Sequence, residues 1–386
     1  MSGALNTRAA ALIALALAAP ACADDAPAPY APPSELSAAP PPGFPPMRIP
    51  ADNAFTREKA ELGRYLFYER KLSGNETQSC GSCHRQRLAF TDGRAQSIGS
   101  TGDVTPRGSM SLVNAGYNAT HTWANPSLRL LERQAMVPMF GEVPVELGLA
   151  GREAEMLARL RADARYPAMF QRAFPGEAEP VTLDNVLKAI ATFERAILSG
   201  DSPYDRYQRG DRAALSASAQ RGAGLFFGER LECFHCHGGF NFSDAVVNAN
   251  TRIDETPFHN TGLYNVDGNG AYPAANTGVF AVTANAADMG RFRAPTLRNI
   301  AVTAPYMHDG SVATLEETLD HYAAGGRRIA AGPNAGDGSR SPLRSELVQG
   351  FALSNEERAD VVAFLRALTD ETLLRDPRFA DPFGRE

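Results

Sequence analysis

The stretches CGSCH at residues 80–84 and CFHCH at residues 233–237 decide the fold of this chain. Two thiols at this spacing can bond to the two vinyl groups on one edge of a porphyrin, and the histidine that follows can bind the iron. Two disulfides or a zinc site are the alternatives, but a zinc ribbon gives no reason for a histidine directly after each cysteine pair. The sequence therefore predicts two covalently bound haem c groups. The residues that would hold them are Cys80, Cys83, His84, Cys233, Cys236 and His237.

Length and charge narrow the class of protein. The 386 residues are enough for two domains, each with its own core. The net charge is −6 and no long run of lysine and arginine occurs, which argues against nucleic acid as a partner. No segment is apolar over a length that would cross a bilayer, so we expect no membrane span.

The first residues are typical of a secretory signal. Arg8 supplies the positive start, residues 9–19 form a short apolar run, and residues 21–23 are small where a signal peptidase would cut. Cys22 offers a lipoprotein anchor as an alternative, but Ala19 occupies the position at which such a signal prefers leucine. We therefore predict a signal peptide over residues 1–23 and, because haem attachment of this kind fits an exported protein, a location in the bacterial periplasm.

The rest of the chain divides by composition and periodicity. Residues 24–48 are rich in proline and alanine and predict a disordered linker. Thr56 can cap a helix that runs through Leu66, and apolar periodicity predicts further helices over 152–162, 182–198 and 355–368. Residues 85–130 predict long irregular loops, the stretch 200–210 links the two halves, and strand signals are sparse.

A weak internal repeat points to a duplicated architecture. GRYLF at residues 63–67 precedes the first haem motif, and GAGLF at residues 222–226 precedes the second. We expect both segments to lie on helices that lead into the haem motifs. The sequence thus predicts a mainly α protein built of two cytochrome c-like domains, residues 49–205 and residues 206–386, the latter with a C-terminal tail.

Five further stretches resemble the di-haem cytochrome c peroxidase/MauG family over residues 49–383. They are IPADN at 49–53, LGR at 62–64, TFERA at 192–196, APTLRN at 294–299 and TAPYMHDG at 303–310. The resemblance implies two cytochrome c-like domains related by a pseudo-twofold axis, with one covalent haem in each and the haems facing across an interface. It also implies hydrogen peroxide as a substrate.

The first haem is expected to be open to peroxide. Ordinary members of the family carry a histidine in the loop after the first haem motif that closes this iron, but no histidine lies between His84 and His121. His121 itself is two residues from Trp123 and is expected to be structural. The N-terminal domain is therefore the one in which peroxide would react.

The resemblance also implies the residues above this iron. Gln134 and Glu146 match a glutamine and a glutamate of the family pocket, and Pro138 matches a proline that lines it. A carboxylate there can carry a proton from one peroxide oxygen to the other. The segment from Pro138 to Glu146 is about two residues longer than the family pattern, so Glu142 remains a rival for this role.

The second haem is expected to be closed by a tyrosine. Tyr322 lies fourteen residues after His308, where ordinary members carry a methionine and the MauG-like branch carries a tyrosine. A phenolate is a hard anionic ligand that favours high oxidation states, whereas a thioether favours Fe(II). Met307, Met289 and His321 are the other candidate ligands.

Two further positions carry family roles. Trp123, the only tryptophan, matches an aromatic bridge between the haems. Thr303 and Pro305 match backbone ligands of a calcium ion that the family holds there. The asparagine usually found after the loop arginine is replaced by Gly108, and Asn114 could not substitute for it without a loop shift.

The predicted activity follows from this pair of unlike haems. Hydrogen peroxide would produce a shared, bis-Fe(IV)-like high-valent state that oxidises a periplasmic partner protein at tryptophan by long-range electron transfer, in the manner of MauG-type or MbnH-type members. The first alternative is a cytochrome c peroxidase that reduces peroxide to water with a small cytochrome or cupredoxin as electron donor. The second is a di-haem electron carrier with no catalytic activity.

Overall fold

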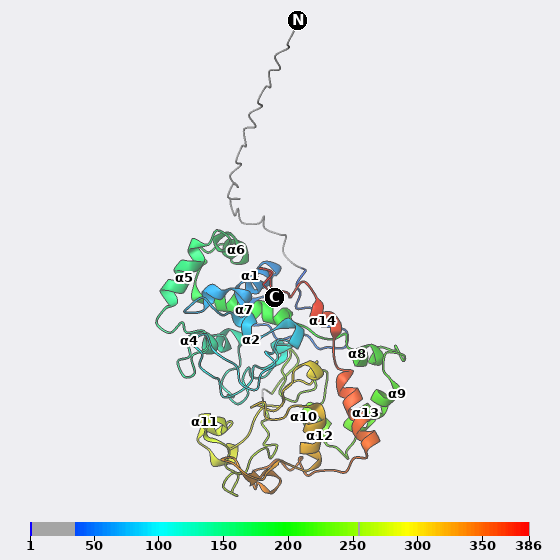
Figure 1. Cartoon of the computed structure of the whole chain (residues 1–386). Coiled ribbons are helices and arrows are strands. Elements are labelled where there is room, and N and C mark those ends of the chain that lie inside the picture. The colour runs from blue at the N-terminus through cyan, green and yellow to red at the C-terminus, as the bar shows by residue number, and fades with distance from the viewer. Residues whose placement is uncertain (2–34, 254, 386) are drawn as a thin grey trace. The chain divides into compact units, whose positions relative to one another are not determined.

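The computed structural model describes residues 35–253 and 255–385, together with Met1. This body belongs to one compact unit, Ala31–Glu386. The predicted signal peptide and the first part of the predicted linker lie outside the described residues. The body is mostly helical with little sheet, as the sequence predicts, and the helices are joined by long irregular segments (Figure 1).

The α-helices are α1 Arg57–Tyr68, α2 Cys80–Cys83, α3 Leu131–Gln134, α4 Met136–Phe140, α5 Glu153–Ala162, α6 Tyr166–Ala173, α7 Leu183–Ala196, α8 Pro203–Gln208, α9 Ala217–Phe226, α10 Cys233–His237, α11 Phe280–Thr283, α12 Leu315–Ala323, α13 Asn355–Arg366 and α14 Glu371–Arg375. The 3-10 turns are η1 Ala51–Asn53, η2 Arg70–Leu72, η3 Gln86–Leu88, η4 Ala115–Tyr117, η5 Ala274–Asn276, η6 Ala286–Asp288, η7 Ile300–Val302 and η8 Gly338–Arg340. Strands β1 Arg328–Ile329 and β2 Gly336–Asp337 form an antiparallel pair.

The helices predicted from capping and periodicity are confirmed as α1, α5, α7 and α13. Thr56 caps α1 by accepting a hydrogen bond from the backbone N–H of Lys59 (3.2 Å), and Thr182 caps α7 in the same way. Residues 85–130 contain only the turns η3 and η4 and are otherwise irregular, as predicted. The link over 200–210 is partly helical, because Ser202 forms a capping box and Pro203 starts α8.

The two haem-motif helices are each preceded by a helix that crosses a second helix at a glycine. In α1, a Cβ added to Gly63 would clash with the carbonyl oxygen of Ala189 in α7. In α9, a Cβ added to Gly222 would clash in the same way with the carbonyl oxygen of Asp360 in α13. Only glycine allows backbones to approach this closely, so the two GxxxF segments of the repeat have the same packing role.

The aromatic residues around these crossings repeat as well. The rings of Phe67 and Phe193 lie 5.2 Å apart in the first pair, and those of Phe226 and Phe364 lie 5.1 Å apart in the second. Each pair is part of a separate hydrophobic core cluster, one around α1 and α7 and one around α9 and α13. The sequence repeat therefore corresponds to a repeated packing unit.

The predicted linker is partly wrong. Residues 35–48 form neither helix nor strand and include a turn at 42–43, but Leu36 is 1% exposed within the first core cluster and Met47 is also buried. Phe44 packs edge-to-face on Tyr117 and Phe240, with ring centroids 6.1 and 4.8 Å away. The prolines exclude helix and sheet, yet the apolar side chains between them still have a core surface to cover, so composition alone misjudges this segment.

The C-terminal tail returns to the first half of the chain. Leu373, Leu374 and Phe379 belong to the core cluster of α1 and α7. The Tyr68 hydroxyl donates to the carbonyl of Phe379 (2.8 Å), and the Gln86 amide donates to the carbonyl of Leu373 (2.7 Å). Residues 370–385 therefore pack on the N-terminal half, although the sequence places them in the segment 206–386.

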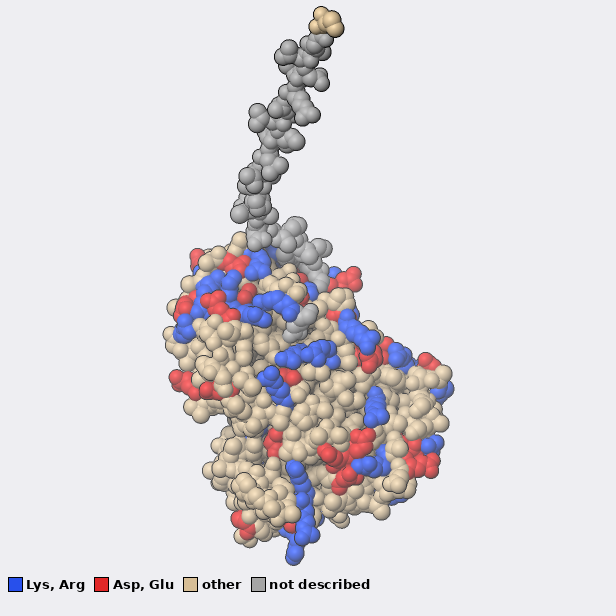
Figure 2. All heavy atoms as spheres, viewed as in Figure 1, with Lys and Arg blue, Asp and Glu red and all other residues tan. Residues whose placement is uncertain are grey.

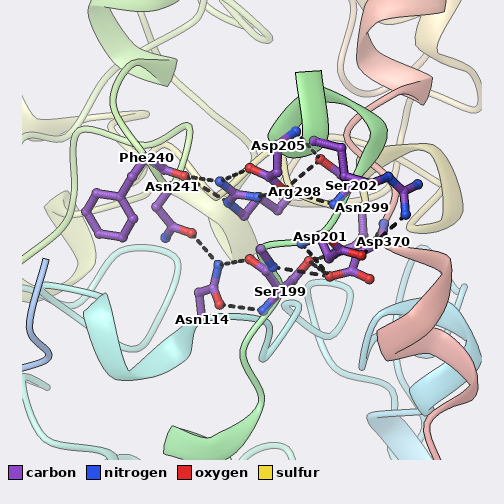
Figure 3. Close-up of polar contacts among 12 residues, drawn as sticks. Asn114, Ser199, Asp201, Ser202, Asp205, Phe240, Asn241, Arg298, Asn299 and Asp370 are labelled. Carbon is purple, nitrogen blue, oxygen red and sulfur yellow. Dashed lines mark hydrogen bonds and ion pairs between the residues drawn. The ribbon is translucent and has the colours of Figure 1, made fainter. Parts of the chain in front are cut away.

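A buried polar network joins the segments between the two helix pairs (Figure 3). Arg298 is 2% exposed and forms a bidentate ion pair with Asp205 (2.8 and 3.0 Å). The Asp370 carboxylate accepts hydrogen bonds from Ser199 and the two backbone N–H groups that follow, and Asn299 bonds both Asp370 and Ser199. The APTLRN stretch thus has a structural role. Its last two residues, Arg298 and Asn299, hold the segment 199–205 and the start of α14 in place.

The surface carries mixed charge. On the face drawn in Figure 2, basic and acidic side chains are interspersed and no single-sign patch covers it. A search of the described residues finds no helix with both the length and the hydropathy needed to cross a membrane.

Candidate active site

The two haem motifs fold into turns with the same hydrogen bond. The Nδ1 atom of His84 lies 2.7 Å from the carbonyl oxygen of Phe90, and that of His237 lies 3.1 Å from the carbonyl oxygen of Phe242. Because a carbonyl only accepts, each Nδ1 carries the proton and each Nε2 keeps its lone pair. Such a hydrogen bond fixes the tautomer and orientation of a metal-binding histidine.

The two carbonyls are aimed by unusual backbone conformations. Phe90 and Phe242 are fully buried and have φ angles of 61° and 49°, in the left-handed region. This conformation costs energy for a residue with a large side chain, so the surrounding core must hold it. The core therefore orients both histidine rings, each towards its own cavity.

The four described cysteines are free thiols, and the two pairs line separate cavities. The disulfide alternative and a shared four-cysteine zinc site are therefore wrong. Burial raises the pKa of Cys83 to about 11 and that of Cys233 to about 12, mainly by desolvation.

The first cavity has a volume of about 630 Å³ and brings together the residues predicted to react with peroxide. Gln134 at the end of α3, Pro138 in α4 and Glu146 in the following loop line it together with Cys80 and His84. Desolvation raises the pKa of Glu146 above its ordinary value. A raised pKa lies closer to neutral pH, so the carboxyl group can both accept and return a proton.

Glu142 does not line this cavity. It is exposed and pairs with Val145 in an isolated β-bridge, which makes the intervening residues an outward turn. Val143, at the tip, is 97% exposed. The segment between Pro138 and Glu146 thus contains a surface turn, and Glu146 lies on the cavity wall.

His121 lines neither of the cavities that contain the haem motifs. It borders a separate hollow with Arg48, Arg129 and Arg195. Its pKa is lowered to about 3, chiefly by burial and then by the charge of Arg293. A neutral histidine in this place fits the structural role expected for it.

The second cavity, of about 1280 Å³, contains Tyr322. Tyr322 lies in α12 and lines the cavity with Cys233, Cys236 and His237. Desolvation, and then the nearby Cys236, raise the pKa of its hydroxyl, so the residue is neutral until a metal displaces the proton. Among the described residues no hydrogen bond is made by this hydroxyl, which leaves it available within the cavity.

The other candidate ligands are placed differently. Met307 lines the second cavity, whereas Met289 and His321 do not. The sequence reasoning overlooked His308, which is buried, lines the same cavity and has no partner for Nε2 among the described residues. Its ring stacks on Phe292 with centroids 3.7 Å apart, so its orientation is set by an aromatic contact that no sequence pattern reveals.

A third cavity, the junction cavity, adjoins both. It shares Ser109 with the first cavity and Trp123, Met307 and Arg293 with the second. The indole N–H of Trp123 donates to the carbonyl of Gly108 (3.1 Å), and its own carbonyl accepts from the backbone N–H of Arg293 (2.9 Å). Two hydrogen bonds thus fix the predicted bridging tryptophan where the junction cavity meets the second cavity.

Arg293 provides an observation that fits a haem in the second cavity. It is 3% exposed, and neither Nε nor Nη1 has a hydrogen-bond partner among the described residues. Burial lowers its pKa to about 10. A buried guanidinium without an anion is costly by several kcal/mol, about 3–5 for a broken buried pair. A haem propionate is a carboxylate of the right charge for this position, and two cavities that each contain a CxxCH turn supply the attachment points.

The calcium residues lie on the wall of the junction cavity. Thr303 and Pro305 both line it. A Cβ at Gly108 would lie 2.8 Å from the carbonyl oxygen of Arg94, so an asparagine there would require a different loop. Asn114 is engaged with Ser199 and cannot turn towards the cavity. Asn118 also lines the cavity, and its Oδ1 has no partner among the described residues, so it is a further oxygen donor for a cation.

The sequence analysis quoted TFERA without assigning its glutamate. Glu194 lies near the end of α7, lines the first cavity and is 5% exposed. Its Oε2 has no hydrogen-bond partner among the described residues. In the register given by the two glycine contacts, the counterpart of Glu194 in α13 is a leucine, and this difference marks the residue.

Comparisons with known proteins identify the family of this chain. Residues 57–213 match the family model described as di-haem cytochrome c peroxidase. A cytochrome c peroxidase of Denitromonas iodatirespirans is 34% identical over 350 residues, covering 86% of this chain and 87% of that protein. The methylamine utilization protein MauG of Methylorubrum extorquens is 33% identical over 322 residues, covering 83% and 81%.

Among solved structures, a MauG-like protein associated with microbial copper homeostasis is 54% identical, with a TM-score of 0.87 over 89% of this chain and 98% of that one. The chain belongs to the di-haem cytochrome c peroxidase/MauG family. It is therefore a haem-dependent oxidoreductase of the peroxidase type.

Proposed function

We propose that this chain uses hydrogen peroxide at the first cavity to oxidise a partner protein, at a tryptophan side chain of that partner, by long-range electron transfer. The asymmetry of the two cavities carries the proposal. The first is lined by an acid, Glu146, and an amide, Gln134, whereas the second has Tyr322 on its wall. Bound haem would supply the redox chemistry in each cavity, and two electrons from the partner together with two protons would turn one peroxide into two waters.

The residues of the first cavity have distinct roles in this proposal. Glu146 moves a proton between the two oxygens of peroxide, which makes one of them a leaving water. Gln134 orients the peroxide by hydrogen bonding, and Pro138 keeps that side of the cavity free of a competing iron ligand. His84 would hold the haem from the opposite side through Nε2.

In this proposal a haem in the second cavity would hold an oxidising equivalent but would not bind peroxide. His237 and the Tyr322 oxygen would be the protein ligands of the iron of a haem held in this cavity. An anionic phenolate stabilises a higher oxidation state than a thioether does. Trp123 lies between the cavities and is proposed to pass electrons from the second to the first.

The remaining assignments belong to the same proposal. The two haems are covalently attached, one in residues 49–205 and one in 206–386, in cytochrome c-like domains related by a pseudo-twofold axis. The repeated glycine crossings and histidine hydrogen bonds support this duplication. The protein is exported to the periplasm, and a calcium ion held partly by Thr303 and Pro305 lies in the junction cavity. That the relative with 54% identity is associated with copper homeostasis makes a copper-handling partner protein the first candidate substrate.

The test is a reaction with a tryptophan-containing partner. The purified holoprotein, a candidate partner and hydrogen peroxide are incubated together, and the partner is analysed by mass spectrometry for oxidised tryptophan. We expect modification that requires peroxide and is lost in Tyr322→Met but not in Leu347→Met, a matched change of another residue lining the second cavity. Rapid peroxide turnover with no change in any partner would contradict the proposal.

A second candidate function is peroxide reduction with a small cytochrome or cupredoxin as electron donor. It is favoured by Met307, which lines the second cavity and could supply the thioether ligand of an ordinary peroxidase. Magnetic circular dichroism of the resting protein distinguishes the two ligands. Loss of the phenolate signature in Tyr322→Phe with no change in Met307→Leu supports the tyrosine, and the reverse supports the peroxidase.

A further inference from the structure

The two glycine crossings allow α7 and α13 to be aligned residue by residue. At one aligned position the two helices carry side chains of different chemical character. Counting from the residues that contact the two glycines, Ala189 and Asp360, the fully buried Phe193 and Phe364 are each four positions further on. The segments TFERAIL at 192–198 and AFLRALT at 363–369 therefore correspond.

The residue after each phenylalanine faces a cavity. Glu194 lines the first and Leu365 lines the second. The same scaffold position thus carries a carboxyl group in one half and an apolar side chain in the other. Leucine shows that packing at this position needs no polar group, so the glutamate is not required by the scaffold.

The environment of Glu194 favours the neutral form of its carboxyl group. Burial dominates and raises its pKa to about 8, while Arg195 lowers it and Glu132 raises it. The Glu132 carboxylate already pairs with Arg195 (2.7 Å), so that arginine is not free to neutralise Glu194. The titratable or charged groups on the elements around α7 include Lys59, Glu61 and Tyr68 on α1, Cys80 and Cys83 on α2 with His84 at its end, Tyr117 on η4, Glu132 on α3, Lys188 and Arg195 on α7 and Glu146 in the loop across the cavity.

Its position next to Cys80 connects this acid to the haem. Desolvation raises the pKa of the Cys80 thiol most, and the charge of Glu194 is the second largest cause. An ionised Glu194 would therefore place a negative charge beside the covalent attachment of the first haem, in a cavity with little solvent to screen it. A negative charge there opposes the gain of an electron by the iron, and a neutral carboxyl does not.

We propose that Glu194 couples electron gain at the first haem to the uptake of one proton. The inference rests on the assignment of the first cavity to a haem within the proposed function. With haem held in the first cavity and Glu194 ionised, one electron from a small one-electron donor protein would reduce the iron from Fe(III) to Fe(II), and one proton from solvent would neutralise the Glu194 carboxylate. Glu146 has a separate task, since it transfers a proton between the oxygens of peroxide. Peroxide reduction consumes two protons for every two electrons, so a buried acid that gains its proton with the electron keeps one ready at the cavity.

The test is a spectroelectrochemical titration of each haem in the full holoprotein, at pH values on both sides of the Glu194 pKa of about 8. We expect the potential of the first haem to fall as the pH rises through this range, because the ionised acid disfavours reduction. Glu194→Gln and Glu194→Leu, the latter copying the second half, should remove this slope, while Glu194→Asp should restore part of it. Glu146→Gln should keep it.

The second haem is the internal control, and Leu365→Glu is the converse variant. It should give the second haem a pH-dependent potential that the wild type lacks at this position. A protonated-carboxyl band in the redox-induced infrared difference spectrum should disappear in Glu194→Gln. A slope that persists in Glu194→Gln with both haems bound overturns the inference. Because the titration needs no partner protein, failure of the proposed tryptophan oxidation leaves this result readable by itself.

Discussion

The two halves of the molecule share a scaffold and differ in what lines their cavities. Both have a glycine crossing, a pair of phenylalanines at about the same separation, and a histidine whose Nδ1 bonds a buried carbonyl. The first cavity then has Glu146 and Glu194, whereas the corresponding surroundings of the second have Tyr322 and Leu365. The comparison shows that the glycine crossings and the histidine hydrogen bonds are common to both halves, while the side chains that line the two cavities differ.

The largest effect is expected from a substitution of Glu146 in the first cavity. Glu146→Gln should slow the reaction with peroxide by about 10²–10⁴-fold, the usual contribution of a general acid–base group. Stopped-flow absorption of the haem bands measures it. The matched control is Glu142→Gln, at the exposed turn outside the cavity, which should leave the rate unchanged. An equal loss in both variants would contradict the assignment.

The pH dependence of the same reaction provides a second test of the role assigned to Glu146. Glu146 must be ionised to accept a proton, and desolvation raises its pKa. The rate should therefore be full above this raised pKa and fall as the pH drops through it. Glu146→Gln should show no such acidic limb in a stopped-flow pH series.

A second prediction concerns the network that holds the segments between the halves. Arg298→Met leaves the Asp205 carboxylate buried without its partner, so we expect a loss of about 3–5 kcal/mol in the free energy of unfolding. Chemical denaturation of the holoprotein measures it. Arg206→Met is the control, because that arginine is 44% exposed in its pair with Asp201 and should contribute less than about 1 kcal/mol.

The third prediction tests whether the two helix crossings are equivalent. Gly63→Ala and Gly222→Ala should each destabilise the protein by about 1–3 kcal/mol, because the new methyl group clashes with a backbone carbonyl. Gly224→Ala, on the same helix as Gly222, faces open space and should be stabilising by up to about 1 kcal/mol. Thermal denaturation compares the three, and a harmless Gly222→Ala would show that the crossing can relax.

The smallest effect concerns the caps of the two helices that precede the haem motifs. Thr56 accepts from the backbone N–H of Lys59 (3.2 Å), and Ser216 accepts from that of Ala219 (3.1 Å). Thr56→Ala and Ser216→Ala should each lower the free energy of unfolding by about 1 kcal/mol. The two losses should be similar if the halves are built alike. Unequal losses in thermal denaturation would show that tertiary packing stabilises one of these helices more than the other.

Much of the site was accessible from the sequence because its chemistry is local in the chain. A CxxCH motif specifies attachment and ligand within five residues, and Thr56 and Thr182 mark helix starts through hydrogen bonds three residues long. The grouping of Gln134, Pro138 and Glu146 on one wall agrees with the expectation from the family resemblance. Their catalytic roles remain predictions, as does iron ligation by Tyr322.

Other features escaped sequence reasoning because they depend on distant parts of the chain. The burial of Leu36 and Met47 depends on core surfaces far along the sequence, so a proline-rich composition could not predict it. Arg293 and Asn118 are informative only through partners that they lack, which no sequence pattern can show. Glu194 is recognised only when two helices are set in register by their glycine contacts.

The amino-acid sequence by itself determined that this protein is mostly helical, that it carries two haem motifs and that glycine–phenylalanine segments precede them, because each of these depends on residues close together in the chain. Only the tertiary structure decided which side chains share a cavity, where the tail packs and which acid is buried without a partner. The physical reason is that desolvation and close packing depend on the whole surrounding fold, whereas a motif acts over one or two helical turns.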